Sequence, residues 1–202
     1  RKAYLKTAHS LDQALSTISG KPPLVIWVSS TSVYGNTNGA WVDEDSTTEP
    51  ETFSGRILLA AEEVIQQFSC SKTVIRFSGI YGPGRARMIN QIREGRGRPS
   101  QPKIWSNRIH SEDCAGVIAH LINLYEQGEA LHPVYLASDS EPVTQHDVRR
   151  WLANQMDIEL VEEPAQAGPT RRCSNKILLE SGYQFKYPTY REGYLSLLEN
   201  MG

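Results

Sequence analysis

Apolar positions along the chain alternate between helical and extended spacing. Leu5, Ala8, Leu11 and Leu15 recur at helical spacing, which predicts a helix that ends at the Gly-Lys-Pro-Pro segment 20–23. Because helical segments alternate with short apolar runs, we predict the α/β class with a largely parallel sheet. Further helices are expected at 54–68, 88–93, 110–125, from a cap at Thr144 to Met156, and near Lys176 and Glu192; strands at 24–28, 73–77, 134–137 and 158–161; and a loop at 95–99.

The first of these strands points to a candidate site. Residues 24–28 form an uninterrupted apolar run, which is typical of a strand buried on both faces of a parallel sheet. The run is followed at once by the polar segment 29–32, Ser-Ser-Thr-Ser. Open α/β sheets bind ligands at the carboxyl ends of their strands, so we expect a ligand site here.

Composition narrows the function classes. The 202 residues, 39% hydrophobic and 22% charged with a net charge of −2, suit an ordinary globular core and give no reason to expect a nucleic-acid or membrane partner. The cysteines, Cys70, Cys114 and Cys173, form no CxxC pair, which argues against a disulfide framework and a zinc site. We therefore predict a cytoplasmic protein without a metal.

Three blocks together resemble the extended and atypical short-chain dehydrogenase/reductases. Residues 28–35, VSSTSVYG, are similar to the superfamily's strand-end segment SSxxVYG; 76–84, RFSGIYGPG, to its RxxNVYGP segment; and 107–113, NRIHSED, to its IHVxD segment. All three occur in family order. Segments 54–58 and 182–188 also resemble the YeeZ-like subgroup of the NAD-dependent epimerase/dehydratase family.

The resemblance implies a Rossmann-like, doubly wound, mostly parallel sheet with a small C-terminal α/β lobe. The family's GxxGxxG loop, which holds the dinucleotide pyrophosphate, has no counterpart in this sequence. We therefore expect residues 1–202 to be the C-terminal part of one NAD(P)-binding protein. The core would comprise 1–105 and 110–137, and the substrate-side lobe 138–202. The cofactor would be NAD or NADP.

The family's mechanism assigns candidate catalytic and cofactor-binding residues. Ser30 occupies the position whose hydroxyl hydrogen-bonds the reacting substrate oxygen; the alternative is a serine that only caps a turn. Tyr34 is an alternative acid, because it lies next to the expected site and a proton donor must be able to reach the substrate. The expected cofactor-binding residues are Ser29, Ser30, Arg56, Phe77 and Ser78.

The family's YxxxK pair has no clear counterpart. Alignment through Glu62 puts Ser54 at the tyrosine position and Leu58 at the lysine position, and a shift of two residues gives Thr52 and Arg56. Arg56 would donate hydrogen bonds to ribose or phosphate but could not act as a base. Alternatively, Arg56 is a surface residue that pairs with Glu63 or Asp45.

Residues of the second and third blocks are candidates for substrate binding. Gly79 replaces the family's sugar-contacting asparagine, and Arg108 lies two positions from its diphosphate-binding arginine. The basic stretch 85–98 is either a lip for an anionic substrate or a solvated surface. The full set of expected substrate-binding residues is Thr31, Gly79, Tyr81, Arg85, Arg108 and His110.

The resemblance leaves two functions open. One is an NAD(P)-dependent epimerase, dehydratase or reductase that acts on a nucleotide sugar or a similar small polar metabolite. The other is an NAD(P)-binding sensor or scaffold without turnover, because the YxxxK pair is missing and a fold does not guarantee chemistry. A homodimer through the helix beginning near Ser54 is a further expectation.

Overall fold

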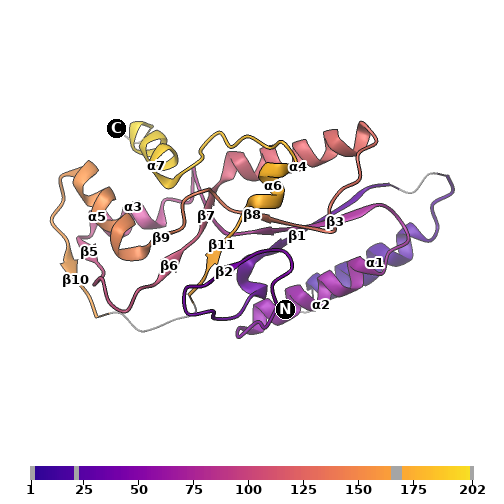
Figure 1. Ribbon diagram of the computed structural model, residues 1–202, viewed down its shortest axis with the longest axis horizontal. Helices are drawn as coiled ribbons and strands as arrows, with labels where there is room; N and C mark the ends of the chain where they lie inside the picture. The colour runs from indigo at the N-terminus through magenta and orange to yellow at the C-terminus, as the bar shows by residue number, and fades with distance from the viewer. Residues whose placement is uncertain (1–2, 21–22, 165–169, 201–202) are drawn as a thin grey trace.

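A central parallel sheet organises the computed structural model, which describes residues 3–20, 23–164 and 170–200 (Figure 1). Its strands, in the order β1 (Val25–Ser30), β3 (Lys72–Phe77) and β8 (Val134–Ala137), are all parallel. Val25 lies opposite Lys72, and Val74 opposite Val134. The carboxyl ends of the strands therefore meet at one edge, as the sequence predicts.

Helices cover both faces of the sheet. α1 (Ala3–Leu15) and α2 (Phe53–Gln66) pack on one face, where Ala61 and Ile65 join Val25 and Val74 in a buried cluster. α4 (Ser111–Glu126) and α6 (Lys176–Glu180) pack on the other, where Leu121 and Leu178 join Ile75. These layers confirm the α/β, Rossmann-like prediction.

The edges of the sheet differ from the sequence-based expectation. β3 is the strand buried along almost its whole length, whereas Val28 of β1 is 46% exposed. The prediction that 24–28 is buried on both faces is wrong at Val28, because β1 has a partner strand on one side only among the described residues. At the opposite edge, side chains satisfy the outer amides of β8: the Val134 N–H donates to His132 Nδ1, and the Leu136 N–H to Glu44 Oε1 at 2.7 Å.

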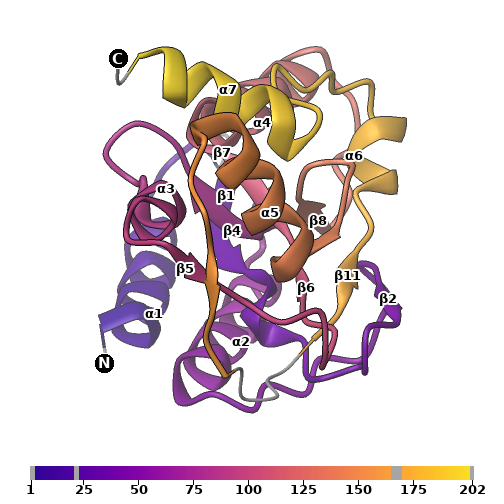
Figure 2. The same cartoon turned by 90° about the vertical axis from the view of Figure 1, so that its left-hand side faces the viewer.

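A second cluster of helices lies beyond the carboxyl edge. α3 (Arg87–Arg93), α5 (Gln145–Met156) and α7 (Tyr190–Glu199) pack around Ile89, Leu152 and Tyr194. Figure 1 shows them at one end of the molecule, and Figure 2 views that end directly. The predicted cap at Thr144 is confirmed, because its hydroxyl accepts from the Asp147 N–H.

Short paired strands connect this cluster to the sheet. β5 (Arg96–Gly97) interrupts the predicted loop 95–99 and pairs with β10 (Val161–Glu162), so the strand expected at 158–161 is displaced towards the C-terminus. The other pairs are β4 (Gly79–Tyr81) with β7 (Arg108–His110), β6 (Trp105–Ser106) with β9 (Val143–Thr144), and β2 (Trp41–Val42) with β11 (Arg172–Cys173).

Packing crosses the predicted boundary at residue 138. Leu178 of α6 packs with α4 and β8, and α3 packs with α5. The division into a core and a substrate-side lobe therefore stays a prediction.

Candidate functional site

Two strands of the sheet end at a cavity. β1 ends at Ser30, whose Oγ accepts from the Ser32 N–H at 3.1 Å and caps the 3₁₀ turn Thr31–Val33. β3 ends at Phe77, directly before Ser78. Ser30 therefore has the turn-capping role that the sequence allows, and its side chain also borders a cavity.

The Ser30 cavity, as we name it, has a volume of about 300 Å³. Its lining is polar, with a single charged side chain, that of Arg171. The buried Ser78 Oγ has no hydrogen-bond partner in the described protein. The lining residues are Ser30, Thr31, Ser32, Ser78, Gly79, Trp105, Ser106, Asn107 and Arg171.

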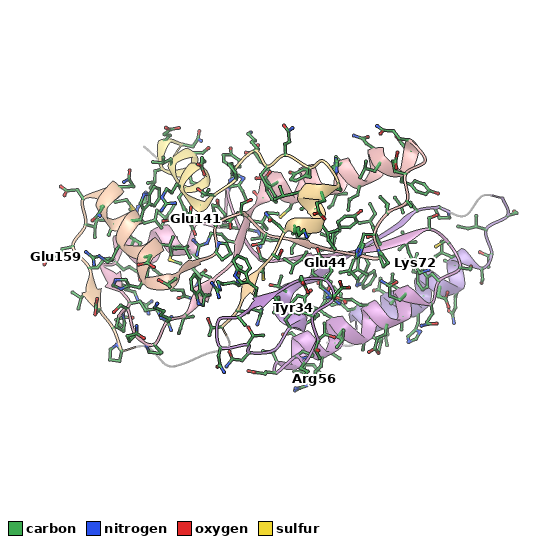
Figure 3. The ribbon with its side chains drawn as sticks, viewed as in Figure 1. Tyr34, Glu44, Arg56, Lys72, Glu141 and Glu159 are labelled. Carbon is green, nitrogen blue, oxygen red and sulfur yellow. The ribbon has the colours of Figure 1, made fainter. Side chains whose placement is uncertain are left out.

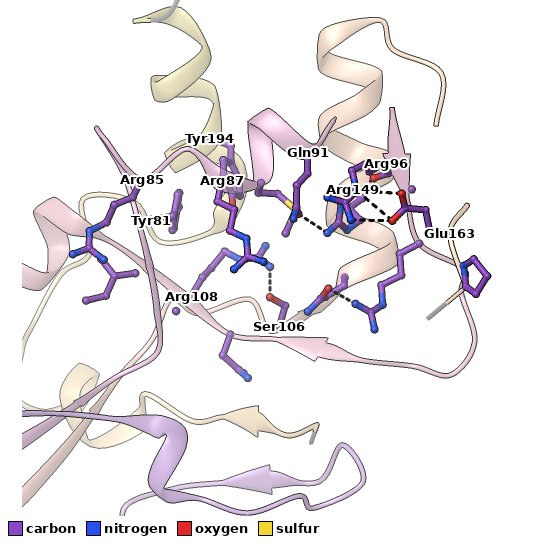
Figure 4. Close-up of a pocket in the computed structure, with 18 residues that line it drawn as sticks. Tyr81, Arg85, Arg87, Gln91, Arg96, Ser106, Arg108, Arg149, Glu163 and Tyr194 are labelled. Atoms are coloured by element: carbon purple, nitrogen blue, oxygen red, sulfur yellow. Dashed lines mark hydrogen bonds and ion pairs between the residues drawn. The ribbon is translucent and has the colours of Figure 1, made fainter. Parts of the chain in front are cut away.

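A second cavity of about 510 Å³ adjoins the first, with which it shares Gly79, Ser106 and Asn107 (Figure 4). We call it the arginine cavity. Tyr81, Gln91, Glu163 and Tyr194 contribute to its wall. The arginines that line it are Arg85, Arg87, Arg96, Arg98, Arg108 and Arg149.

Arg108 is held at the junction of the two cavities. It is 3% exposed, and its Nη2 donates to Ser106 Oγ at 2.5 Å. Its guanidinium lies 5.5 Å from the centre of the Tyr190 ring and 5.8 Å from that of Tyr194. Its buried Nη1 has no hydrogen-bond partner among the described residues.

Positive charges crowd the other wall of the arginine cavity. Arg149 of α5 donates to the Arg96 carbonyl at 2.9 Å and to Gln91 Oε1 at 2.7 Å. Burial, together with the charges of Arg98 and Arg96, lowers the pKa of Arg149. The only acidic side chain in the described lining, Glu163, pairs with Arg96 at 3.1 Å. The net positive charge favours an anionic ligand.

Ser29 and Tyr34 belong to a buried network instead of a cavity wall. Arg76 pairs with Glu62 at 2.7 Å, Ser29 Oγ donates to the same carboxylate, and Arg76 Nη1 donates to Tyr34 Oη at 2.8 Å. The Tyr34 hydroxyl donates to the Asp43 carbonyl at 2.6 Å. Burial raises the pKa of Tyr34 to about 12, which makes it a weaker acid.

Arg56 lies on the surface at the start of α2 (Figure 3). Its Nη1 donates to the carbonyls of Pro50, at 3.3 Å, and Glu51, at 3.0 Å. The expected alternative pairing with Glu63 or Asp45 is wrong, because these nearby carbonyls occupy the guanidinium. Arg56 lines neither cavity, and its contact with a dinucleotide stays a prediction.

Phe77 and His110 lie outside both linings as well. Phe77 is part of the buried cluster under α4. His110 is the N-cap of α4, because its Nδ1 accepts from the Glu112 N–H at 3.3 Å. Burial lowers the pKa of His110, and its ring packs 4.1 Å from that of Tyr187. The structure therefore gathers Ser30, Thr31, Ser78 and Gly79 in one cavity, and Gly79, Tyr81, Arg85 and Arg108 in the other.

Sequence reasoning missed Arg149 and Arg171. Arg149 lies on a helix that was expected from its cap at Thr144, and Arg171 precedes a two-residue strand without a recognisable pattern. Both arginines are far in sequence from the three family-like blocks, so no local sequence pattern links them to the cavities.

Comparison with known proteins places the chain in a family. The model of the RmlD substrate binding domain matches residues 18–201. The chain belongs to this family. It is 29% identical over 193 residues to the protein YeeZ of Escherichia coli K12, a match that covers 92% of this chain and 65% of YeeZ. The chain thus spans less than two thirds of that relative.

Solved structures agree with this family assignment. A Methylobacillus flagellatus protein described as an NAD-dependent epimerase/dehydratase is 38% identical, with a TM-score of 0.82 over 99% of this chain and 74% of that chain. The UDP-glucuronic acid 4-epimerase of Bacillus cereus, solved with UDP-glucuronic acid and NAD, is 18% identical. Its TM-score is 0.78 over 94% of this chain and 64% of that chain, which shows a shared fold.

The described residues offer neither a metal site nor a membrane-spanning helix. No three His, Cys, Asp or Glu side chains there are grouped so that they would hold a metal ion. Within the same ranges, no helix combines the length and apolar character needed to cross a bilayer.

Proposed function

We propose that the full-length protein containing this chain is an NAD(P)-dependent epimerase/dehydratase-like enzyme that acts on a nucleotide sugar. The observation that carries this proposal is the pair of adjoining cavities at the carboxyl edge of the sheet. One presents Ser30 and the other an excess of arginines. Ligands of open α/β sheets bind at this edge.

The Ser30 cavity fits the nicotinamide end of a dinucleotide. The unpartnered Ser78 hydroxyl and the Ser30 hydroxyl offer hydrogen bonds to a carboxamide and a substrate oxygen. A bound nicotinamide would accept or supply a hydride. The likeness in fold to an epimerase solved with NAD supports a nicotinamide cofactor without deciding between NAD and NADP.

The arginine cavity suits a diphosphate. Guanidinium groups bind phosphate oxygens through paired, charge-assisted hydrogen bonds. Arg108 would bind near the point where the two cavities meet, because its Nη2 donates to Ser106, which lines both. The reacting sugar would then lie beside Ser30, whose hydroxyl would orient its oxygen.

A second function, NAD(P) binding without turnover, is favoured by the α2 helix. Ser54 is exposed at the aligned tyrosine position, and Leu58, at the aligned lysine position, packs against the buried cluster that contains Val33 and Tyr34. In addition, no tyrosine lines the Ser30 cavity within the described ranges.

Turnover and binding assays on the full-length protein separate the two functions. We expect calorimetry to detect NAD(H) or NADP(H), and a panel of nucleotide sugars to include one that is converted. Cofactor binding without conversion of any panel member would favour the sensor or scaffold. Failure to bind either cofactor or nucleotide sugar would contradict both. Cytoplasmic location and dimerisation through α2 remain predictions, the latter testable by sedimentation.

A further inference from the structure

Arg171 occupies a fixed position in the wall of the Ser30 cavity. Its Nη1 donates at 3.2 Å to the carbonyl of Gly35, the last residue of the SSxxVYG-like block. The Asn107 side chain holds the backbone on either side: Nδ2 donates to the Arg171 carbonyl at 2.9 Å, and Oδ1 accepts from the Cys173 N–H at 2.8 Å. The Gly35 carbonyl therefore positions the guanidinium, and Asn107 holds the backbone that carries it.

No carboxylate in the described part of the chain neutralises the charge of Arg171. Among residues 3–20, 23–164 and 170–200, no carboxylate forms an ion pair with it, and its buried Nε has no hydrogen-bond partner. Burial raises the pKa of the neighbouring Cys173 thiol to about 12, so the thiol stays neutral near pH 7. A partly buried cation without a counter-charge is costly, and an anionic ligand would remove that cost.

The rest of the Ser30 cavity supports an anionic group of limited size. Every other lining side chain that is polar carries a hydroxyl, an indole or an amide, so nothing in the described wall repels a negative charge. A diphosphate already has a larger set of cations in the adjoining arginine cavity. A single guanidinium fork matches the two oxygens of a carboxylate.

We propose that Arg171 binds a carboxylate on the sugar ring that lies beside Ser30, so that the preferred substrates are nucleotide-linked uronic acids. This inference rests on the proposed function, because it places the diphosphate in the arginine cavity. The two cavities share Gly79, Ser106 and Asn107, so one extended ligand with negative charge at both ends spans them.

Two matched ligand pairs test the carboxylate. UDP-glucuronic acid and UDP-glucose differ only at carbon 6 of the sugar, as do glucuronic acid 1-phosphate and glucose 1-phosphate, which do not depend on the base. Dissociation constants are measured by calorimetry on the cofactor-saturated full-length protein. The wild type should bind the acidic member of a pair about ten- to a hundredfold more tightly, the range for a charge-assisted contact.

Arg171→Gln should abolish most of this preference. Its affinity for the neutral member of each pair should stay within about threefold of the wild-type value. Arg171→Lys, which keeps the charge, should retain part of it. Arg93→Gln is the matched control for the loss of one positive charge, because Arg93 is exposed on α3 and lines neither cavity.

The possible outcomes separate the two proposals. Equal affinity for both members of a pair in the wild type, or an unchanged preference in Arg171→Gln, overturns the carboxylate inference and leaves the proposed function standing. A loss of NAD(P)(H) affinity in Arg171→Gln with the preference intact would assign Arg171 to the cofactor, which also overturns it. Failure of every probe to bind would count against both proposals.

Discussion

Ser30 combines a structural and a proposed catalytic role in one hydroxyl. Its Oγ accepts from the Ser32 N–H and also faces the Ser30 cavity. If the hydroxyl orients a reacting oxygen, Ser30→Ala should lower kcat/KM by roughly ten- to a thousandfold, as for the loss of one oriented donor. Steady-state kinetics measure this effect.

The control for Ser30 must separate the two roles. Loss of the cap alone should cost about 1 kcal/mol of unfolding free energy, which thermal unfolding detects. Ser30→Thr retains a hydroxyl and should retain more activity than Ser30→Ala. Unchanged kinetics in the alanine variant would remove Ser30 from the mechanism.

Two arginines on α3 test the arginine cavity. Arg87 and Arg93 are both exposed on this helix, but only Arg87 lines the cavity. Arg87→Ala should weaken binding of a nucleoside diphosphate about three- to tenfold, towards the low end for a charge-assisted contact because the side chain is solvated. Calorimetric titration with UDP measures the change.

Arg93→Ala is the matched control, because it changes the net charge by the same amount as Arg87→Ala. It should bind UDP with wild-type affinity, because Arg93 does not line the cavity. Raising the salt concentration should reduce the difference between the two variants, since exposed charges are screened. Equal weakening in both would show that only the general positive potential matters.

At the scale of elements, α7 approaches β4 closely because position 193 is a glycine. A Cβ built at Gly193 would lie 1.9 Å from the Tyr81 hydroxyl oxygen. Alanine normally favours a helix over glycine by about 1 kcal/mol. Here we expect Gly193→Ala to destabilise the protein by about 1–3 kcal/mol, because overpacking must displace Tyr81 or α7. Urea unfolding measures the change.

Tyr81→Phe offers a test of the mechanism, because it removes the oxygen that the new methyl group would meet first. The cost of Gly193→Ala should be smaller in that background. Since Tyr81 and Tyr194 line the arginine cavity, the alanine variant should also bind UDP more weakly. An increase in stability would contradict the close approach.

Elements with a long periodic pattern were predictable from the sequence, and shorter ones were not. The helix expected at 110–125 is present as α4, and three residues of the polar segment 29–32 line the Ser30 cavity, whose ligand stays a prediction. The paired strands β5 and β10 contain two residues each, too few to show alternation. Arg149 and Arg171 reach the cavities only through tertiary packing, which local patterns do not encode.

The stability of the whole molecule should depend on the protonation of Asp139. This residue follows β8, is 1% exposed, and has no hydrogen-bond partner for either carboxylate oxygen among the described residues. Burial raises its pKa from 3.8 to about 8, despite the opposing effect of Arg108. The folded protein therefore holds a proton that the unfolded chain releases within this pH window.

Because the folded state binds the extra proton, this group makes stability fall as pH rises from about 4 to about 8. Asp139→Asn should remove that fall and be more stable than the wild type at pH 8–9 by about 1–3 kcal/mol. Thermal unfolding at several pH values measures this: at pH 8–9 the Tm of the variant should exceed that of the wild type by a few degrees for each kcal/mol. Parallel pH profiles for the two proteins would contradict the buried proton.

The two outer edges of the sheet have different consequences for its extension by further strands. The outward N–H groups of Val134 and Leu136 in β8 already donate to His132 and Glu44, so they are not available to pair with another strand. β1 has no such block in the described ranges, and Val28 adds an exposed apolar side chain beside its open backbone. An unprotected edge strand readily accepts a further strand. In the longer NAD(P)-binding protein that the family resemblance leads us to expect, additional strands of the sheet would therefore pair with β1 and not with β8.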